Sequence, residues 1–87
     1  MPHILTRLQN VQFEDIKLML KEHAPIHAEQ GMYVEHIWQN DDNSNEVIFL
    51  FRVDDLNKAK KFIKNVHRQA LKENPHANLP QMTFLDE

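Results

Sequence analysis

The chain of 87 residues contains no cysteine. Disulfide bonds and zinc sites built on thiolates are therefore excluded, and neither can support the fold. A domain of this length buries only roughly 60–65% of the surface of its unfolded chain, so it needs another source of stability. Self-association is the usual source in a chain without cross-links. We therefore expect a small domain that pairs with a second copy of itself.

Glycine is almost as scarce, since Gly31 is the only one. The loops that cradle phosphates, GxGxxG and GxxxxGK[ST], need at least two glycines, so the common nucleotide-binding motifs are excluded. No stretch approaches the roughly 18–20 apolar residues of a membrane span, and the apolar start is too short for a signal peptide. We expect a cytoplasmic protein with no membrane partner. The net charge of −3 argues against nucleic acid as a partner.

The pattern of apolar residues predicts the order strand–helix–strand–strand–helix–strand. The predicted strands cover residues 4–9, 32–39, 47–51 and 81–85, and the predicted helices 13–24 and 56–70. The polar run 40–45 has the composition of a turn. No linker, repeat or low-complexity tract interrupts the chain, so we predict a single domain over residues 1–87.

Particular residues mark the ends of the predicted helices. Asn10 is placed to cap the first helix, and Asp54 or Asp55 the second. Pro25 leaves open whether the first helix continues or breaks there, because an interior proline kinks or ends a helix. Gly31 is expected to end that helix in the left-handed conformation.

Two helices packed on one face of a four-stranded antiparallel sheet form the ferredoxin-like α+β arrangement. The strand at 47–51 is apolar on both faces, which implies that both faces of the sheet are covered. The two helices cover only one face, and uncovered apolar patches of more than a few hundred Å² usually mark interfaces. We therefore predict a homodimer in which two sheets stack face to face.

Several short features, together with the order of elements, carry a resemblance to a known superfamily. They are Met1-Pro2 before a strand bearing Arg7, Glu22-His23-Ala24, Gly31, the hairpin Asn40–Val47, Asp54-Asp55-Leu56 and the ending Thr83-Phe84-Leu85-Asp86. Over nearly its whole length the chain resembles the small dimeric α+β barrel proteins, which include antibiotic-biosynthesis-monooxygenase-like and cyclase-like families. The resemblance implies a dimer with a pocket between helices and sheet, in a superfamily that hosts monooxygenases and isomerases. The asparagine, tryptophan and histidine of its haem-degrading members are matched only by His67, so no cofactor is expected.

Three histidines on the predicted helices are the main candidates for chemistry. On a helical wheel His23 and His67 fall on the arcs that face the sheet, as does His27 if the first helix continues. We interpret His67 and His23 as catalytic proton acceptors and His27 as a ligand-binding residue, because imidazole titrates near neutral pH. Two alternatives stay open: imidazoles hydrogen-bonded within a solid core, or a metal held by His23 and His27 with Glu22 or Glu29. No acidic or cysteine cluster completes such a ligand set, so we predict no metal site.

Three strand residues complete the candidate ligand-binding site. The guanidinium of Arg7 could bind a carboxylate or phenolate through its planar fork, or pair with Glu35 or another acid. His36 and Trp38 are expected on one strand face together with Val34. They could form an aromatic wall for a flat ligand, or pack in an interface.

These features predict a homodimeric small-molecule-binding protein. The chemistry that the resemblance implies is that of a cofactor-independent monooxygenase or an isomerase/cyclase acting on an aromatic or polyketide-like substrate. His67 or His23 would then remove a proton, Arg7 would hold the anion, and Trp38 would shape the wall. The alternative is a non-catalytic accessory or stress-related dimer module without a ligand. A cavity lined by at least two of the helix histidines favours the first reading, and a solid core with hydrogen-bonded imidazoles the second.

Overall fold

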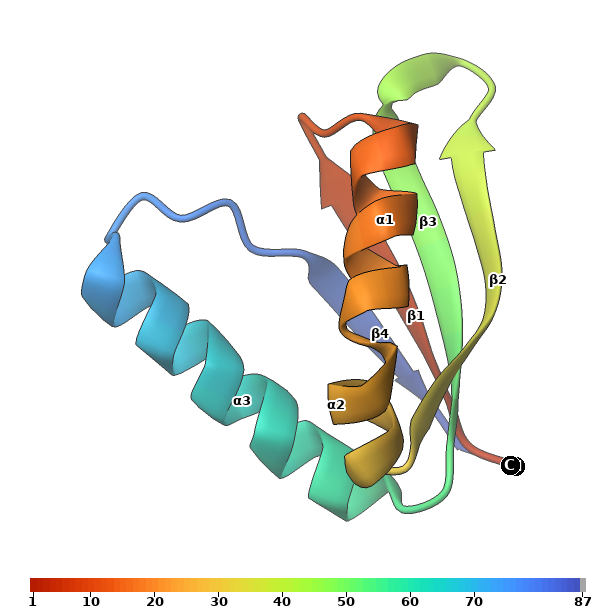
Figure 1. The fold of residues 1–87 in the computed structure, drawn as a ribbon, viewed down its shortest axis with the longest axis vertical. Helices are drawn as coiled ribbons and strands as arrows, with labels where there is room; N and C mark the ends of the chain where they lie inside the picture. Colours follow the sequence, from red (N-terminus) through yellow and green to blue (C-terminus); the bar gives the residue numbers. More distant parts are fainter. Residues whose placement is uncertain (87) are drawn as a thin grey trace.

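The computed structural model describes residues 1–86. The elements follow in the order β1 (His3–Gln9), α1 (Phe13–Glu22), α2 (Ala24–Glu29), β2 (Met32–Asn40), β3 (Asn43–Val53), α3 (Leu56–Glu73) and β4 (Gln81–Leu85). The strands form one antiparallel sheet in the order β2-β3-β1-β4, and the helices lie on one face of it (Figure 1). The described residues thus form an α+β domain that is compatible with a ferredoxin-like fold. No helix within residues 1–86 is long and apolar enough to cross a membrane.

The core lies between the sheet and the helices. Alternation along β1 and β3 sends every second side chain toward the helices. The apolar residues buried in this way are Ile4, Leu8, Val47, Phe49, Phe51 and Val53. Ile16 and Leu20 of α1 and Ala59 and Ile63 of α3 close the core from the other side. Each large apolar side chain buried there contributes about 1.5–3 kcal/mol.

The first predicted helix is in fact two helices. α1 ends before His23, which has φ −91° and ψ 0°, and α2 begins at the next residue with Pro25 in its first turn. Proline is tolerated there because the first N–H groups of a helix have no intrahelical partner. The break therefore precedes Pro25, which answers the question that the sequence left open.

Two of the predicted end residues are confirmed and one is wrong. Gly31 has φ +69°, in the left-handed region, and a Cβ added there would lie 3.2 Å from Cβ of Asp54. Asp55 caps α3, because its side chain accepts a hydrogen bond from the N–H of Lys58. Asn10 does not cap α1, which has no side-chain cap. Instead Asn10 itself is left-handed, with φ 60°, a conformation that its short polar side chain tolerates.

β2 contains one extra residue relative to β3. Val34 and His36 are two residues apart, yet they pair with the consecutive residues Phe51 and Leu50. Such a bulge leaves one residue unpaired and reverses the alternation of side chains beyond it. The prediction that His36 and Trp38 share a face with Val34 is therefore wrong. Val34 lies on the helix side of the sheet, and His36 and Trp38 lie on the other side.

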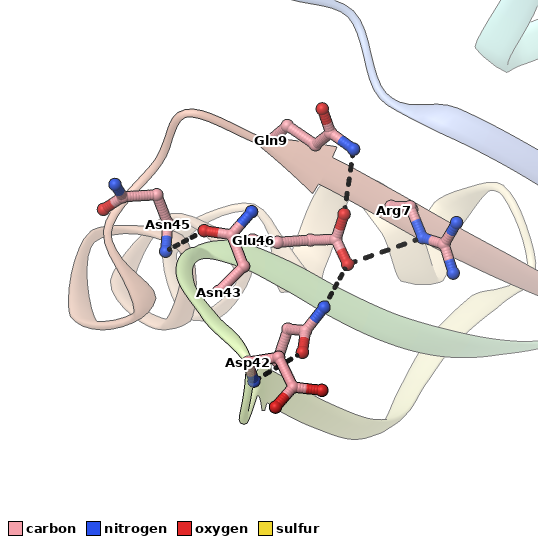
Figure 2. A network of polar contacts seen from close by, with 7 residues as sticks. Arg7, Gln9, Asp42, Asn43, Asn45 and Glu46 are labelled. Atoms are coloured by element: carbon pink, nitrogen blue, oxygen red, sulfur yellow. Dashed lines mark hydrogen bonds and ion pairs between the residues drawn. The ribbon is translucent and has the colours of Figure 1, made fainter.

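The hairpin between β2 and β3 is tighter than predicted. β2 continues to Asn40 and β3 begins at Asn43, so only two residues of the polar run lie outside the strands. The side chain of Asn40 accepts a hydrogen bond from the N–H of Asp42, and that of Asn43 from the N–H of Asn45 (Figure 2). Local bonds of this kind allow Asn and Asp to form the tight turn.

The sheet face turned away from the helices, which we call the open face, is not covered by any element of residues 1–86. It carries both apolar and polar side chains at alternate strand positions. Its apolar members are Leu5, Tyr33, Trp38, Ile48, Leu50 and Leu85. Trp38, at 45% exposure, and Leu85, at 44%, are among the most exposed large apolar residues. A single chain therefore leaves apolar surface in water on this side.

Candidate functional site

A groove of about 320 Å³ lies between α1–α2 and α3, above the helix side of the sheet. We call it the helix groove. α3 runs at an angle to α1, and the two helices diverge toward the C-terminal end of α3 (Figure 1). The apolar lining includes Phe49 and Phe51 from β3, Met19 and Leu20 from α1, and Phe62 and Val66 from α3. The helix groove therefore offers an apolar surface that extends from the sheet to both helices.

Three imidazoles from three segments line the helix groove. His23 lies at the junction of α1 and α2, His27 on α2, and His67 on α3. The rings of His23 and His27 are 6.2 Å apart between centroids, with their planes at 79°. His27 reaches the groove although the first helix breaks before Pro25. The structure thus brings together the three helix histidines that the sequence singled out.

The three rings have no hydrogen-bond partner among residues 1–86. Nδ1 of His27 is also buried. A buried polar atom without a partner costs about 1–3 kcal/mol. A ligand that forms a hydrogen bond with His27 would remove this cost, so the vacant nitrogen favours binding of a polar group beside the apolar wall.

Burial determines the protonation state of two of these histidines. Desolvation lowers the pKa of His27 from 6.5, and a positive charge on the neighbouring His23 would lower it further. Desolvation also lowers the pKa of His67 from 6.5. A lowered pKa keeps an imidazole neutral at pH 7, which is the form that accepts a proton. Burial therefore favours the neutral form of both His27 and His67.

The histidines do not form a metal-binding set with neighbouring acids. Within residues 1–86, no three side chains of the His, Cys, Asp and Glu types are grouped so that they could hold a metal ion. The pair His23 and His27 thus lacks the further protein ligands that a structural or catalytic zinc site uses. Neither Glu22 nor Glu29, which the sequence offered as additional ligands, completes the set.

The other three predicted ligand-binding residues lie on the open face. Arg7, His36 and Trp38 point away from the helices, so the sheet separates them from the helix groove. The rings of His36 and Trp38 stack, with centroids 5.1 Å apart and planes at 19°. Within one chain the structure does not bring these residues to the histidines. Arg7 therefore cannot hold an anion formed beside His67 of the same chain.

Arg7 instead belongs to a polar network around Glu46 on the open face (Figure 2). The carboxylate of Glu46 accepts hydrogen bonds from Asn40 Nδ2 at 2.8 Å and Gln9 Nε2 at 2.9 Å, and Nε of Arg7 lies 3.7 Å from it. These two hydrogen bonds, followed by the charge of Arg7, lower the pKa of Glu46. Glu46 is only 5% exposed. This residue was not predicted, and its position next to an apolar strand was the available sequence signal.

The part that the loop between α3 and β4 plays in the helix groove was also not predicted. Asn78, Leu79 and Pro80 of this loop line the helix groove. Nδ2 of Asn78 donates a hydrogen bond to the backbone oxygen of Gln9, at 2.6 Å. This bond ties the loop to the end of β1. Leu79, the one large apolar side chain of this connection, was the sequence signal for it.

The groove, its unpaired imidazoles and the polar network of the open face are properties of this chain's own residues. The resemblance to the dimeric α+β barrel proteins stays an expectation from the sequence. Comparisons with family models, with curated proteins and with solved structures find no significant match to the chain.

Proposed function

We propose that this protein is a homodimeric small-molecule-binding protein whose helix groove takes a flat aromatic or polyketide-like ligand. The observation that carries the proposal is the meeting of three unpaired imidazoles in one apolar groove of about 320 Å³. Ligand sites in proteins are typically clefts of roughly 300–1,000 Å³, mostly apolar, with a few polar groups that orient the ligand. The helix groove has this size and this composition.

The chemistry that fits such a site is proton transfer on an acidic, quinol-type substrate. His67 or His23 takes the proton from the substrate hydroxyl, which leaves an anion in the apolar groove and an imidazolium beside it. In an isomerisation the imidazolium returns the proton to a different substrate atom. In a cofactor-independent oxygenation the electron-rich anion reacts with O₂, which is then the second substrate.

A non-catalytic dimer module is the competing function. That function predicts a solid core between helices and sheet, with each imidazole bonded to a protein group. The presence of a groove, and of an unpaired buried Nδ1 in His27, supports the ligand-binding proposal instead. Buried polar atoms without a partner are rare in proteins and often mark functional positions.

The homodimer part of the proposal is supported by the open face. Apolar residues on this face are left partly exposed in the single chain, and Trp38 is the largest of them. Stacking with the open face of a second copy would cover them and give the arrangement of a dimeric α+β barrel. A two-fold contact of this kind uses the same surface on both chains. One substitution therefore alters the interface at two places, once on each chain.

A thermal-shift screen of flat phenolic and quinone compounds tests the ligand site. A compound at about 100 times its Kd should raise the Tm by roughly 10–20 °C. His67→Ala should lose most of this shift. The matched control is His76→Ala, since His76 lies exposed outside the helix groove. If no compound raises the Tm, or if alanine at His23, His27 and His67 leaves the shift intact, the helix groove is not the ligand site.

A further inference from the structure

A second groove lies on the other side of α1, between that helix and the edge strand β2. We call it the edge groove, and its volume is about 400 Å³. Apolar side chains and two lysines line most of it: Leu20, Met32, Val34, Ile37, Lys17 and Lys21. Leu20 and Met32 are buried, whereas Val34 is 38% exposed. The apolar part of the edge groove is therefore partly open to water.

The two lysines of the edge groove have no counter-charge. Lys17 and Lys21 are four residues apart on α1, which places them on the same side of the helix. Neither side chain forms an ion pair or a hydrogen bond with any residue in the range 1–86. Like charges at this spacing repel each other. An anion bound between the two ammonium groups would relieve this repulsion.

We infer that the edge groove binds an amphiphilic carboxylate, meaning a small molecule with one carboxylate and an unbranched apolar chain. The carboxylate lies between Lys17 and Lys21. The chain lies along Val34 and Ile37 and covers the apolar surface that is now exposed. The edge groove shares Leu20, His27 and Met32 with the helix groove. Its two lysines, Val34 and Ile37 lie outside the helix groove, so the inference does not depend on the proposed function.

Two other occupants fit the edge groove less well. A peptide strand added to β2 would need a regular edge, but the bulge at Glu35 interrupts it. Bulges on edge strands prevent pairing with another strand. A second copy related by two-fold symmetry would bring this surface against itself. Lys17 and Lys21 of both chains would then gather at one place and repel.

The test is calorimetric titration of the full chain with decanoate, used below the concentration at which it aggregates. Decanoate should bind, while decanol, which lacks the charge, and acetate, which lacks the chain, should bind far more weakly. Lys17→Gln with Lys21→Gln should weaken decanoate binding by about tenfold or more. The control is Lys61→Gln with Lys64→Gln on α3, which removes the same charge outside the edge groove and should leave the affinity unchanged.

Substitutions at two matched valines distinguish binding in the edge groove from binding in the helix groove. Val34 lines only the edge groove and Val66 lines the helix groove, with exposures of 38% and 46%. Val34→Asn should weaken decanoate binding, and Val66→Asn should not. The inference is overturned if decanoate does not bind, if the lysine variant binds it as tightly as the wild type, or if Val66→Asn has the larger effect. The last result would place the ligand in the helix groove.

Discussion

The imidazole of His27 lies edge-on to the ring of Phe51, with the centroids 5.1 Å apart and the planes at 75°. This contact joins α2 to the floor of the helix groove. It matters for the position of α2, because this helix has only six residues and none of them is fully buried. A neutral imidazole packs well against an aromatic ring in such a position. A charged imidazolium would have to be desolvated, which is the reason that burial lowers the pKa of His27.

The first prediction concerns the pH dependence of stability. The folded-state pKa values of His27 and His67 lie below the unfolded value of 6.5, so the unfolded chain takes up protons first as the pH falls. The stability from these two groups is therefore complete above pH 6.5 and is lost as the pH falls through the folded-state values. His27→Gln with His67→Gln should flatten this part of the profile, measured by urea unfolding between about pH 7.5 and about pH 5.

The control for the pH profile is His76→Gln, because His76 is exposed in the loop after α3. This variant should follow the wild-type curve. A double variant at His27 and His67 that loses as much stability toward acid as the wild type would show that other groups control the profile.

The second prediction concerns self-association. Trp38→Asp places a charge on the open face, and it should convert a dimeric wild type into a monomer in sedimentation velocity. Leu71→Asp is the matched control, because Leu71 lies on α3 and is 42% exposed, against 45% for Trp38. It should leave the dimer intact. A wild-type chain that sediments as a folded monomer at high concentration would refute the dimer directly.

The third prediction concerns the only glycine. Gly31→Ala must accept φ +69° and a Cβ only 3.2 Å from Cβ of Asp54. The left-handed conformation alone costs a residue with a Cβ about 1–2 kcal/mol, and the close contact adds to this cost. The free energy of unfolding in urea should fall by at least that amount. Gln30→Ala should cost less, because Gln30 has φ −94°; equal losses would mean that backbone conformation is not the cause.

The fourth prediction concerns the polar network of the open face. Glu46→Gln removes a carboxylate that accepts two hydrogen bonds and lies near Arg7. The pKa of Glu46 is lowered from 4.5, so its contribution to stability is present above pH 4.5 and is lost as the pH falls through the folded-state value. The variant should be less stable at neutral pH and should lose less stability on acidification. Glu22→Gln, on the exposed side of α1, should leave the acid part of the curve as it is in the wild type.

Most of the fold was predictable because the periodicities of strands and helices are local properties. The last strand, 81–85, was predicted with the bounds that the structure shows, and Gly31 and Asp55 act as expected. The bulge in β2 was not predictable, because it depends on how that strand pairs with β3. The sequence shows two alternating runs but not the extra residue between them.

The candidate site, like the fold, could be predicted from the sequence only in part. The position of His67 follows from the geometry of α3, which fixes the direction of each side chain once the helix is recognised. His27 was expected there only if the first helix continued, so its place in the groove depends on the junction between α1 and α2 at His23. His36 and Trp38 share one face as predicted, but their placement on the same face as Val34 depended on uninterrupted alternation along β2 and was wrong. The helix groove itself depends on the angle between α3 and α1, which results from the packing of the whole core. No local pattern encodes that angle.

The unpaired residue of β2 also fixes which side chains of this strand reach each face of the sheet. Upstream of Glu35 even-numbered side chains of β2 face the helices, and downstream of it odd-numbered ones do. Loss of the Glu35 codon would let Val34 and His36 pair as neighbours with Phe51 and Leu50, so it would leave Ile37 inward and Trp38 outward. Deletion of this one residue would thus leave the contents of both surfaces in place and turn β2 into a regular edge strand.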